Sequence, residues 1–588
     1  MALAGVVGGA ACAGARAPVE GDLRGVPLAD APRELTADQQ VRHALDRVAF
    51  GARPGDVARV RAEGVDRWIE HQLHPERIDD GATDRVLASL TTLGKSGAEL
   101  LRDHPPPGQL LARLAAEQGM APGAAGMAPE SLRARVAVSR ADSLRLREAV
   151  RAGRRVTGEL QAARVVRAVA SERQLQEVMV DFWENHFSVF AGKNRVRYHL
   201  PEYDVSIRAH ALGRFRDLLG AVAKSPAMLQ YLDNFQSVAD STQPTLGGGR
   251  RGARLDDPAV RARALRRLPP ERRAEAEARL AQLARQRRGR GLNENYAREL
   301  LELHTLGVDG GYTQRDVIEV ARALTGWTLR APQQGGGFAF RPEVHDAGAK
   351  RVLGVALPAG RGIEDGEQVL DIVARHPSTA RFVATKLARR FVSDTPPPAL
   401  VERAAATFGR TDGDIGETLR TILHSPEFFS TAAYRAKVKS PFELATSALR
   451  AVGAAPDTSP RTALVVARLG QPLFGHQAPD GWPETGEAWM NTGAILNRIN
   501  FGLAVAAERV PGVDLTAWPV AAQVAGASRA AQVDSVVAAL FGGAVSPDTR
   551  AILLSGEHPM LRAPDARPRA SIAQVVGLAL GAPEFQRR

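Results

Sequence analysis

The chain has 588 residues, of which 44% are hydrophobic and 24% are charged, as is typical of a packed globular protein. No run of apolar residues is long enough to span a bilayer, which excludes an integral membrane protein. Aromatic residues make up only 5%, while Ala and Arg are abundant, and this composition favours helices over sheets. We therefore expect a mainly α fold built as one large multi-helix body.

The net charge of +12 is concentrated in one segment of the sequence. Residues 249–292 contain 14 Arg, no Lys and five acidic residues, a balance of +9, so the rest of the chain is close to neutral. No aromatic residues on which bases could stack lie among these arginines. We expect a solvated, partly helical excursion and no specific nucleic-acid binding, although the stretch is a candidate for weak contact with polyanions.

Cys12 is the only cysteine, which excludes an internal disulfide, a Cys-based zinc site and a thiol relay. It lies in an apolar stretch of small residues, 1–16, that ends in Ala-x-Ala-like sites and resembles the end of a secretory signal. No basic residues precede the stretch, so we expect the start of the signal to be missing. The prediction is an exported protein (periplasmic, cell-surface or extracellular), with Cys12 a candidate lipid anchor; the alternative is an unstructured Ala/Gly terminus.

Sequence signals for the starts of helices and for linkers predict how the rest of the chain is organised. Residues 1–33 are expected to form the signal-like segment and a Pro/Gly linker, and residues 34–588 a single large helical domain. Thr36-Ala-Asp-Gln39 predicts a capped helix start, and Ser225, His376, Ser425 and Ser440 each precede a Pro that can open a helix. Two interruptions are expected: a mobile loop at about 104–130 and the Arg-rich insertion at about 238–291.

One stretch, near 337–354, predicts β structure. Phe338-Ala-Phe340 alternates, Asp346-Ala-Gly348 can turn the chain, and residues 351–354 can return as a second strand. We expect a small β-hairpin attached to the helical body.

The first segment with chemical potential is 177–187. Asp181 and Asn185 are four residues apart on a predicted helix, so they lie on one polar stripe, and Trp183 and His186 stand beside it. The stripe either faces a cavity or meets water. Trp183, Asn185 and His186 are therefore candidate substrate-binding residues.

The second segment is 293–307. Asn295, Glu299 and Glu302 fall on one helical face, and Arg298 lies beside them. Two carboxylates one turn apart, backed by leucines, suit a metal site or an acid/base pair in a helix bundle. The alternative is an internal Arg–carboxylate network that holds helices together. We expect this face to meet the Asp181–His186 stripe across a helix contact, with Asn295 contributing to substrate binding.

The third segment is Val344-His345-Asp346-Ala-Gly348-Ala-Lys350. His345 and Asp346 at a turn can aim at one point, and Lys350 adds a cation. Such a compact group predicts a site, whereas the alternative is an Asx-type turn with a salt bridge.

The fourth segment, 471–501, is rich in Gly, Pro, Trp and His. It predicts a pocket wall containing Trp482 and Asn491, or a long loop that packs for structural reasons.

These motifs together resemble a known family. They are Phe182-Trp-Glu-Asn-His-Phe187, residues 227–234, Asn293 to Leu303 with Gly326-Trp327, His345-Asp-x-Gly-x-Lys350, Gly481-Trp-Pro483 with Trp489-Met-Asn491, and Pro583-Glu-Phe585. Their order is similar to that of the bacterial domain-of-unknown-function 1800 family, from about Thr36 to Phe585. The resemblance implies a predominantly helical, usually exported protein and implies no mechanism.

The leading functional hypothesis is an enzyme, hydrolase-like, that uses a metal or acid/base groups on an extracytoplasmic substrate. Glu299, Glu302, His345 and Asp346 would be acid/base groups or ligands of a divalent metal, the candidate cofactor. Arg298 and Lys350 would orient carboxylates or meet an anionic substrate, and Trp183 and Trp482 would form walls. The alternative is a non-catalytic envelope or binding protein in which the same residues form a structural polar core.

Overall fold

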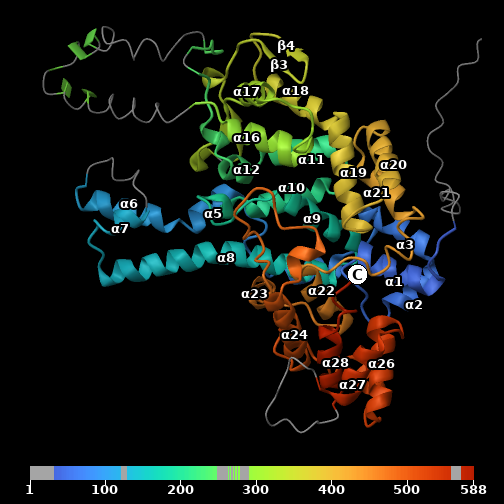
Figure 1. Ribbon diagram of the computed structural model, residues 1–588. Helices are drawn as coiled ribbons and strands as arrows, with labels where there is room; N and C mark the ends of the chain where they lie inside the picture. Colours follow the sequence, from blue (N-terminus) through green and yellow to red (C-terminus); the bar gives the residue numbers. More distant parts are fainter. Residues whose placement is uncertain are drawn as a thin grey trace, which may run out of the picture.

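Helices and their connecting turns make up most of the computed structural model (Figure 1). The structure describes residues 32–120, 129–240, 242–247, isolated positions between 262 and 277, 291–334, 336–557 and 571–588. Within this part of the chain the only sheets are two small antiparallel pairs of strands, so the prediction of a mainly α protein with a small hairpin is confirmed.

The helices of the first half, in chain order, are α1 (Ala37–Val48), α2 (Asp56–Glu63), α3 (Val65–Gln72), η1 (Pro75–Arg77), α4 (Gly81–Leu87), α5 (Gly97–Asp103), α6 (Pro107–Glu117), α7 (Pro129–Arg133), α8 (Arg140–Ala170), α9 (Gln174–His186), η3 (Val196–Tyr198), α10 (Leu200–His210), α11 (Phe215–Lys224), α12 (Pro226–Tyr231), η4 (Asn234–Gln236), α16 (Glu294–Glu299), η5 (Leu300–Thr305) and α17 (Gln314–Ala323).

The second half begins with strands β1 (Trp327–Leu329), β2 (Phe338–Phe340), β3 (Lys350–Val352) and β4 (Val355–Leu357), with η6 (Pro332–Gln334) and η7 (Pro342–Val344) between them. It continues with α18 (Ile363–Ala374), α19 (Pro377–Phe391), α20 (Pro398–Arg410), α21 (Ile415–Leu423), α22 (Pro441–Ala451), α23 (Arg461–Arg468), η8 (Gly486–Trp489), α24 (Thr492–Ala506), α25 (Pro519–Gln523), α26 (Arg529–Phe541), α27 (Pro547–Ser555) and α28 (Ile572–Gly581).

Local capping explains where most of these helices begin. The Thr36 hydroxyl accepts a hydrogen bond from the Gln39 N–H, and the Gln39 side chain accepts one from the Thr36 N–H. Ser440 and Glu443 form the same capping box. Three of the four expected polar-Pro starts open helices, namely α12, α19 and α22. The start expected at Ser425 is wrong: its hydroxyl accepts from Phe428, but the chain makes only turns there.

One continuous core joins most of the helices. It contains buried side chains from α1 at the start of the chain through α28 at its end, with Trp68, Trp183, Trp327 and Trp518 among its largest members. In Figure 1 the long helix α8 and helices α9 and α10 cross the middle of the molecule, between α16–α18 on one side and α22–α28 on the other. Three smaller apolar clusters lie along α8.

The predicted pairing of the hairpin is wrong. Strand β2 pairs with β1, so that Trp327 lies opposite Phe340, and β3 pairs with β4 instead of with β2. The turn between β3 and β4 consists of Leu353 and Gly354, both with positive φ, which matches the twist of a two-residue hairpin. The residues expected to turn the chain, 346–348, are instead held in the interior by charged partners described below.

The expected loop at about 104–130 is partly helical. Pro107 occupies the first turn of α6, and Leu111 and Leu114 pack with Leu132 of α7 and Leu146 of α8 in a core of their own. Apolar spacing of this kind is enough to form a short amphipathic helix when a neighbouring helix covers it. Residues 121–128 lie outside the described residues.

The expected insertion at 238–291 is anchored at its two ends. The Val238 N–H donates to the Gly291 carbonyl at 3.2 Å, and Thr245 forms a bridge with Asp346. Most of the Arg-rich stretch, the signal-like residues 1–31 and Cys12 lie outside the described residues. None of the helices in the described ranges combines the length and apolarity needed to cross a membrane.

Replacing residues 248–290 by a short Gly/Ser linker should leave the body folded, because the two ends of this segment are already tied to the core. The replacement removes +9 of the net charge of +12. We expect cooperative thermal unfolding with an unchanged midpoint and weaker retention on a heparin column. A loss of cooperativity would show that the segment packs against the body, and unchanged retention would show that it does not contact polyanions.

Candidate functional site

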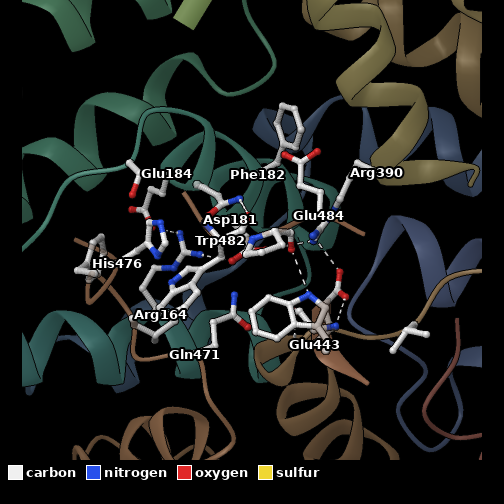
Figure 2. Close-up of a pocket in the computed structure, with 18 of the residues that line it drawn as sticks. Arg164, Asp181, Phe182, Glu184, Arg390, Glu443, Gln471, His476, Trp482 and Glu484 are labelled. Atoms are coloured by element: carbon white, nitrogen blue, oxygen red, sulfur yellow. Dashed lines mark hydrogen bonds and ion pairs between the residues drawn. The ribbon is translucent and has the colours of Figure 1, made fainter. Parts of the chain in front are cut away.

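A charged cavity of about 70 Å³ lies where α8, α9, α19, α22 and the 471–489 segment meet. A volume of this size holds several waters or one small polar group. Figure 2 shows Arg164, Glu184 and His476 on one side of it and Arg390, Glu443 and Glu484 on the other. Its remaining polar lining residues are Asp181, Asn185, Ser188, Lys437, Ser440, Gln471, Trp482, Trp489 and Arg588.

A chain of ion pairs forms one wall of the cavity. One carboxylate oxygen of Asp181 lies 3.0 Å from the Arg164 guanidinium, and its other oxygen lies 3.1 Å from that of Arg390. Glu443 receives Arg390 and Arg588, both at 2.9 Å. No more than 14% of any of these five side chains is exposed. Because each charged group has lost most of its water, its ion-pair partners must stabilise the charge instead. Although burial raises it, Arg390 and Arg588 hold the pKa of Glu443 at about 2.

Glu184 is the member of this wall whose charge is least compensated. One of its oxygens pairs with Arg164 at 2.5 Å, and its other oxygen, Oε1, is buried without a donor. Burial raises the pKa of Glu184 well above its ordinary value, the Arg164 guanidinium opposes this shift, and the neighbouring carboxylate of Asp204 adds to it. The pKa of Asp204 is lowered, although burial raises it, because Arg208 and Arg167 flank this carboxylate. The pKa values of the two neighbouring carboxyl groups therefore shift in opposite directions, and Glu184 is the one whose protonated form is favoured.

Another part of the lining combines aromatic rings with a second undercompensated carboxylate. The rings of His476 and Trp482 are 4.6 Å apart, and those of Trp482 and Trp489 are 6.0 Å apart. His476 Nε2 lies 2.8 Å from Asp480, which fixes the orientation of the imidazole. Both oxygens of Glu484 are buried without a hydrogen-bond donor, and the Lys386 ammonium lies 3.5 Å away.

Asn185 places this aromatic segment against α9. Its amide oxygen accepts from the Trp482 N–H at 2.7 Å and its amide nitrogen donates to the Trp482 carbonyl at 2.9 Å. Gly481 has φ +76°, and a Cβ there would stand 2.2 Å from the Asn185 carbonyl oxygen. Only glycine permits this approach. The predicted substrate-binding residues Asn185 and Trp482 thus lie together at the cavity, and Asn185 acts by holding the loop.

Trp183 and His186, predicted beside them, are in the core. The Trp183 indole donates to the Ala211 carbonyl at 2.9 Å, and His186 Nε2 donates to the His304 carbonyl at 3.0 Å. Burial lowers the pKa of both histidines, that of His304 to about 3, so both rings are neutral. Helix α9 contacts η5 through this His186–His304 pair, and His304 is not part of the predicted Asn295–Glu299–Glu302 face. Asp181 and Asn185 line the cavity instead.

Glu299 and Glu302 flank a change of helix type. From Leu300 the helix widens to a π turn in which the Leu306 N–H reaches the Leu301 carbonyl. Such turns are frequent at functional sites. Both carboxylates are half-buried, and burial, reinforced by the Glu302 charge, raises the pKa of Glu299.

Their neighbours Tyr312 and Gln314 lie at or just before the start of α17. Glu302 accepts from the Tyr312 hydroxyl at 3.2 Å. Arg298 donates to the Gln314 amide at 2.6 Å, and Asn295 is exposed.

Asn491, predicted to bind substrate, is exposed and caps α24 by accepting from Ala494 at 2.9 Å.

His345, Asp346 and Lys350 form a separate, closed network. The carboxylate of Asp346 is fully buried and receives two bonds from Arg322 of α17, at 2.8 and 3.1 Å. Lys350 donates to Asp365 of α18 at 2.7 Å, and His345 Nδ1 donates to the Thr325 carbonyl at 2.8 Å. The segment that the sequence presents as an open turn therefore fastens the β3 region to two helices.

These residues do not join Glu299 and Glu302. Nowhere in the described ranges do three or more His, Cys, Asp or Glu side chains stand close enough together to hold a metal ion. The four predicted metal ligands thus belong to two separate places.

Sequence reasoning missed Arg164, Glu184, Arg390, Glu443 and Glu484. Glu184 lies inside a quoted motif, where a carboxylate between Trp183 and Asn185 was a usable signal. Glu484 directly follows Gly481-Trp-Pro483 in a loop, whereas Arg164, Arg390 and Glu443 come from separate helices and carry no local pattern.

The buried Asp346 predicts a large effect of its neutral isostere. Asp346→Asn removes the two charged hydrogen bonds to Arg322 and leaves Glu319 as its remaining carboxylate in the described residues, so it should cost about 2–3 kcal/mol of unfolding free energy. The matched control is Glu302→Gln, whose carboxylate is half-buried and meets only a hydroxyl, and it should cost less than about 1 kcal/mol. Urea denaturation of the three proteins measures both values. Equal stability of Asp346→Asn and wild type would contradict a structural role for this network.

Comparison with curated proteins finds no match, and comparison with solved structures finds none either. A family model described as protein of unknown function (DUF1800) matches residues 43–587, nearly the whole length over which the helical body and its cavity are built. The chain therefore belongs to the DUF1800 family.

Proposed function

We propose that the protein is an acid–base enzyme, hydrolase-like, whose active site is the charged cavity and whose proton donor is Glu184. The observation that carries this proposal is the state of Glu184 in the cavity wall. Its carboxyl group is buried beside Asp204, has one oxygen without a donor, and has a pKa raised by burial. A carboxylic acid that stays protonated near neutral pH is what general-acid catalysis requires.

The other half of an acid–base pair is His476. Asp480 orients its imidazole, and the ring lines the same cavity as Glu184. Protonation of a leaving group by Glu184 and removal of a proton from water by His476 would together cleave a polar bond. Trp482 and Trp489 supply flat apolar walls, and the buried oxygens of Glu484 favour a substrate group that donates hydrogen bonds, such as a hydroxyl or an amide.

Export belongs to the same proposal. It rests on the signal-like residues 1–16, and it would place the substrate outside the cytoplasm. A divalent metal at Glu299 and Glu302 stays a prediction that metal analysis of the purified protein tests. Asp346 is a poor ligand because Arg322 already occupies both of its oxygens.

The rival function is that of a non-catalytic envelope or binding protein. In that case the ion pairs of Asp181 and Glu443 serve only to hold helices together. The undercompensated carboxyl of Glu184 favours the enzyme, because a purely structural network gains stability by satisfying every buried polar group.

Substitution of the donor tests the enzymatic proposal. Glu184→Gln keeps the shape but cannot release a proton, so it should lower the hydrolysis rate about 10²–10⁴-fold. The assay is a panel of nitrophenyl esters, nitrophenyl glycosides and peptide nitroanilides, with His476→Ala as a second loss variant. Arg67→Gln, at an exposed position of α3, is the control and should keep full activity. Full activity of Glu184→Gln would show that Glu184 is not the proton donor, and no hydrolysis of any probe by the wild type would favour the binding protein.

The pH dependence of stability tests the state of Glu184 without a substrate. Its folded pKa is raised above the ordinary value of 4.5, so between these two values the folded state holds more protons than the unfolded state. Stability contributed by this group is then lost as pH rises. We expect Glu184→Gln to melt at a higher temperature than wild type at pH 7 and at the same temperature at pH 4. A lower melting temperature at pH 7 would show that the charged form is needed for its pair with Arg164.

A further inference from the structure

A second, larger cavity of about 790 Å³ opens between α5, α6, α8, η3 and the ends of β1 and η6. Helices α5, α6 and α8 lie together on one side of the molecule (Figure 1). The cavity shares no lining residue with the one that contains Glu184. Its volume lies within the range of sites that hold organic molecules of drug size.

Three arginines that have no partner in the described part of the chain line this cavity. The guanidinium groups of Arg195, Arg197 and Arg330 make no hydrogen bond or ion pair with any other part of the described chain. No Asp or Glu of that part lines the cavity, so the local charge is uncompensated. Other arginines of the described chain pair with carboxylates, as Arg322 does with Asp346. Three like charges around one opening repel each other and favour an anion between them.

The remaining lining divides into a polar end and an apolar wall. Tyr198, His199 and Gln230 stand beside the arginines, and Gln230 is fixed by a 3.0 Å contact with His199 Nε2. The apolar wall consists of side chains from several elements, namely Ala98, Leu101, Pro106, Ala112, Val150 and Leu329. A ligand that fills this space must therefore carry an anionic head and an apolar body.

We propose that this cavity binds an anionic amphiphile, a carboxylate or phosphate head on an apolar chain or ring. Arg197, the half-buried member of the three, bonds the head, while Arg195 and Arg330, which are exposed, meet it at the entrance. Guanidinium groups match the planar geometry of both head groups. The apolar wall of α5, α6 and α8 covers the body of the ligand and supplies affinity in proportion to the area removed from water.

Calorimetric titration of the full chain with four probes below their micelle concentrations tests the proposal. The probes are decyl phosphate, decanoate, decanol and inorganic phosphate. Decyl phosphate and decanoate should bind, and decanol and inorganic phosphate should each bind at least about tenfold more weakly, because each lacks one half of the recognition. Affinity for the anions should fall as salt rises. The ratio between decyl phosphate and decanoate identifies the preferred head.

Variants assign the binding to this cavity. Arg197→Gln and Arg330→Gln should each weaken decyl phosphate binding, Arg197→Gln about tenfold. Because neither side chain pairs with the rest of the described protein, both variants should keep the wild-type melting temperature. Arg67→Gln, which removes an exposed charge on α3, should change nothing. Wild-type affinity in Arg197→Gln, or equal affinity for decanol and decyl phosphate, would overturn the proposal, and neither result depends on the activity proposed for Glu184.

Discussion

Buried charges that neutralise one another tie the centre of the molecule together. Arg164 of α8, Asp181 of α9, Arg390 of α19, Glu443 of α22 and Arg588 come from five separate parts of the chain. Each ion has lost most of its water, so it is tolerated only while its partners remain in place. The relative positions of these four helices and the last residue are therefore fixed by electrostatics as well as by the apolar core around them.

This constraint also determines where chemistry can occur. Within the network, Asp181 and Glu443 each have two cationic partners, whereas Glu184 shares Arg164 and faces the carboxylate of Asp204. A group with too little positive charge nearby keeps its proton, and a group of that kind at a cavity is able to give the proton away. The same network thus supplies rigidity at these five side chains and, at a sixth, Glu184, the carboxyl group that we propose as the proton donor.

The charged side chains of this protein fall into two groups, those that are paired with opposite charges and those that are not paired within the described chain. The His345–Lys350 segment has all of its cations and carboxylates matched by α17 and α18, so its chemical groups act as fasteners. The arginines of the 790 Å³ cavity are unmatched in the described chain, so their charge is available to a ligand. Pairing, rather than residue type, separates the groups that hold the fold together from those that we propose to bind a ligand.

The sequence by itself determined the helical class, most helix starts and the family, because capping, apolar periodicity and motif order are local properties of the chain. It also selected Asn185 and Trp482, which do lie at the cavity. It did not determine that β2 pairs with β1, that His345 is buried, or that Glu184 and His476 share a cavity. Those outcomes depend on partners such as Arg322, Asp365 and Asp204, which are brought near only by tertiary packing. Burial and the distance to an opposite charge decide what a titratable group does, and neither quantity is written in the neighbouring residues.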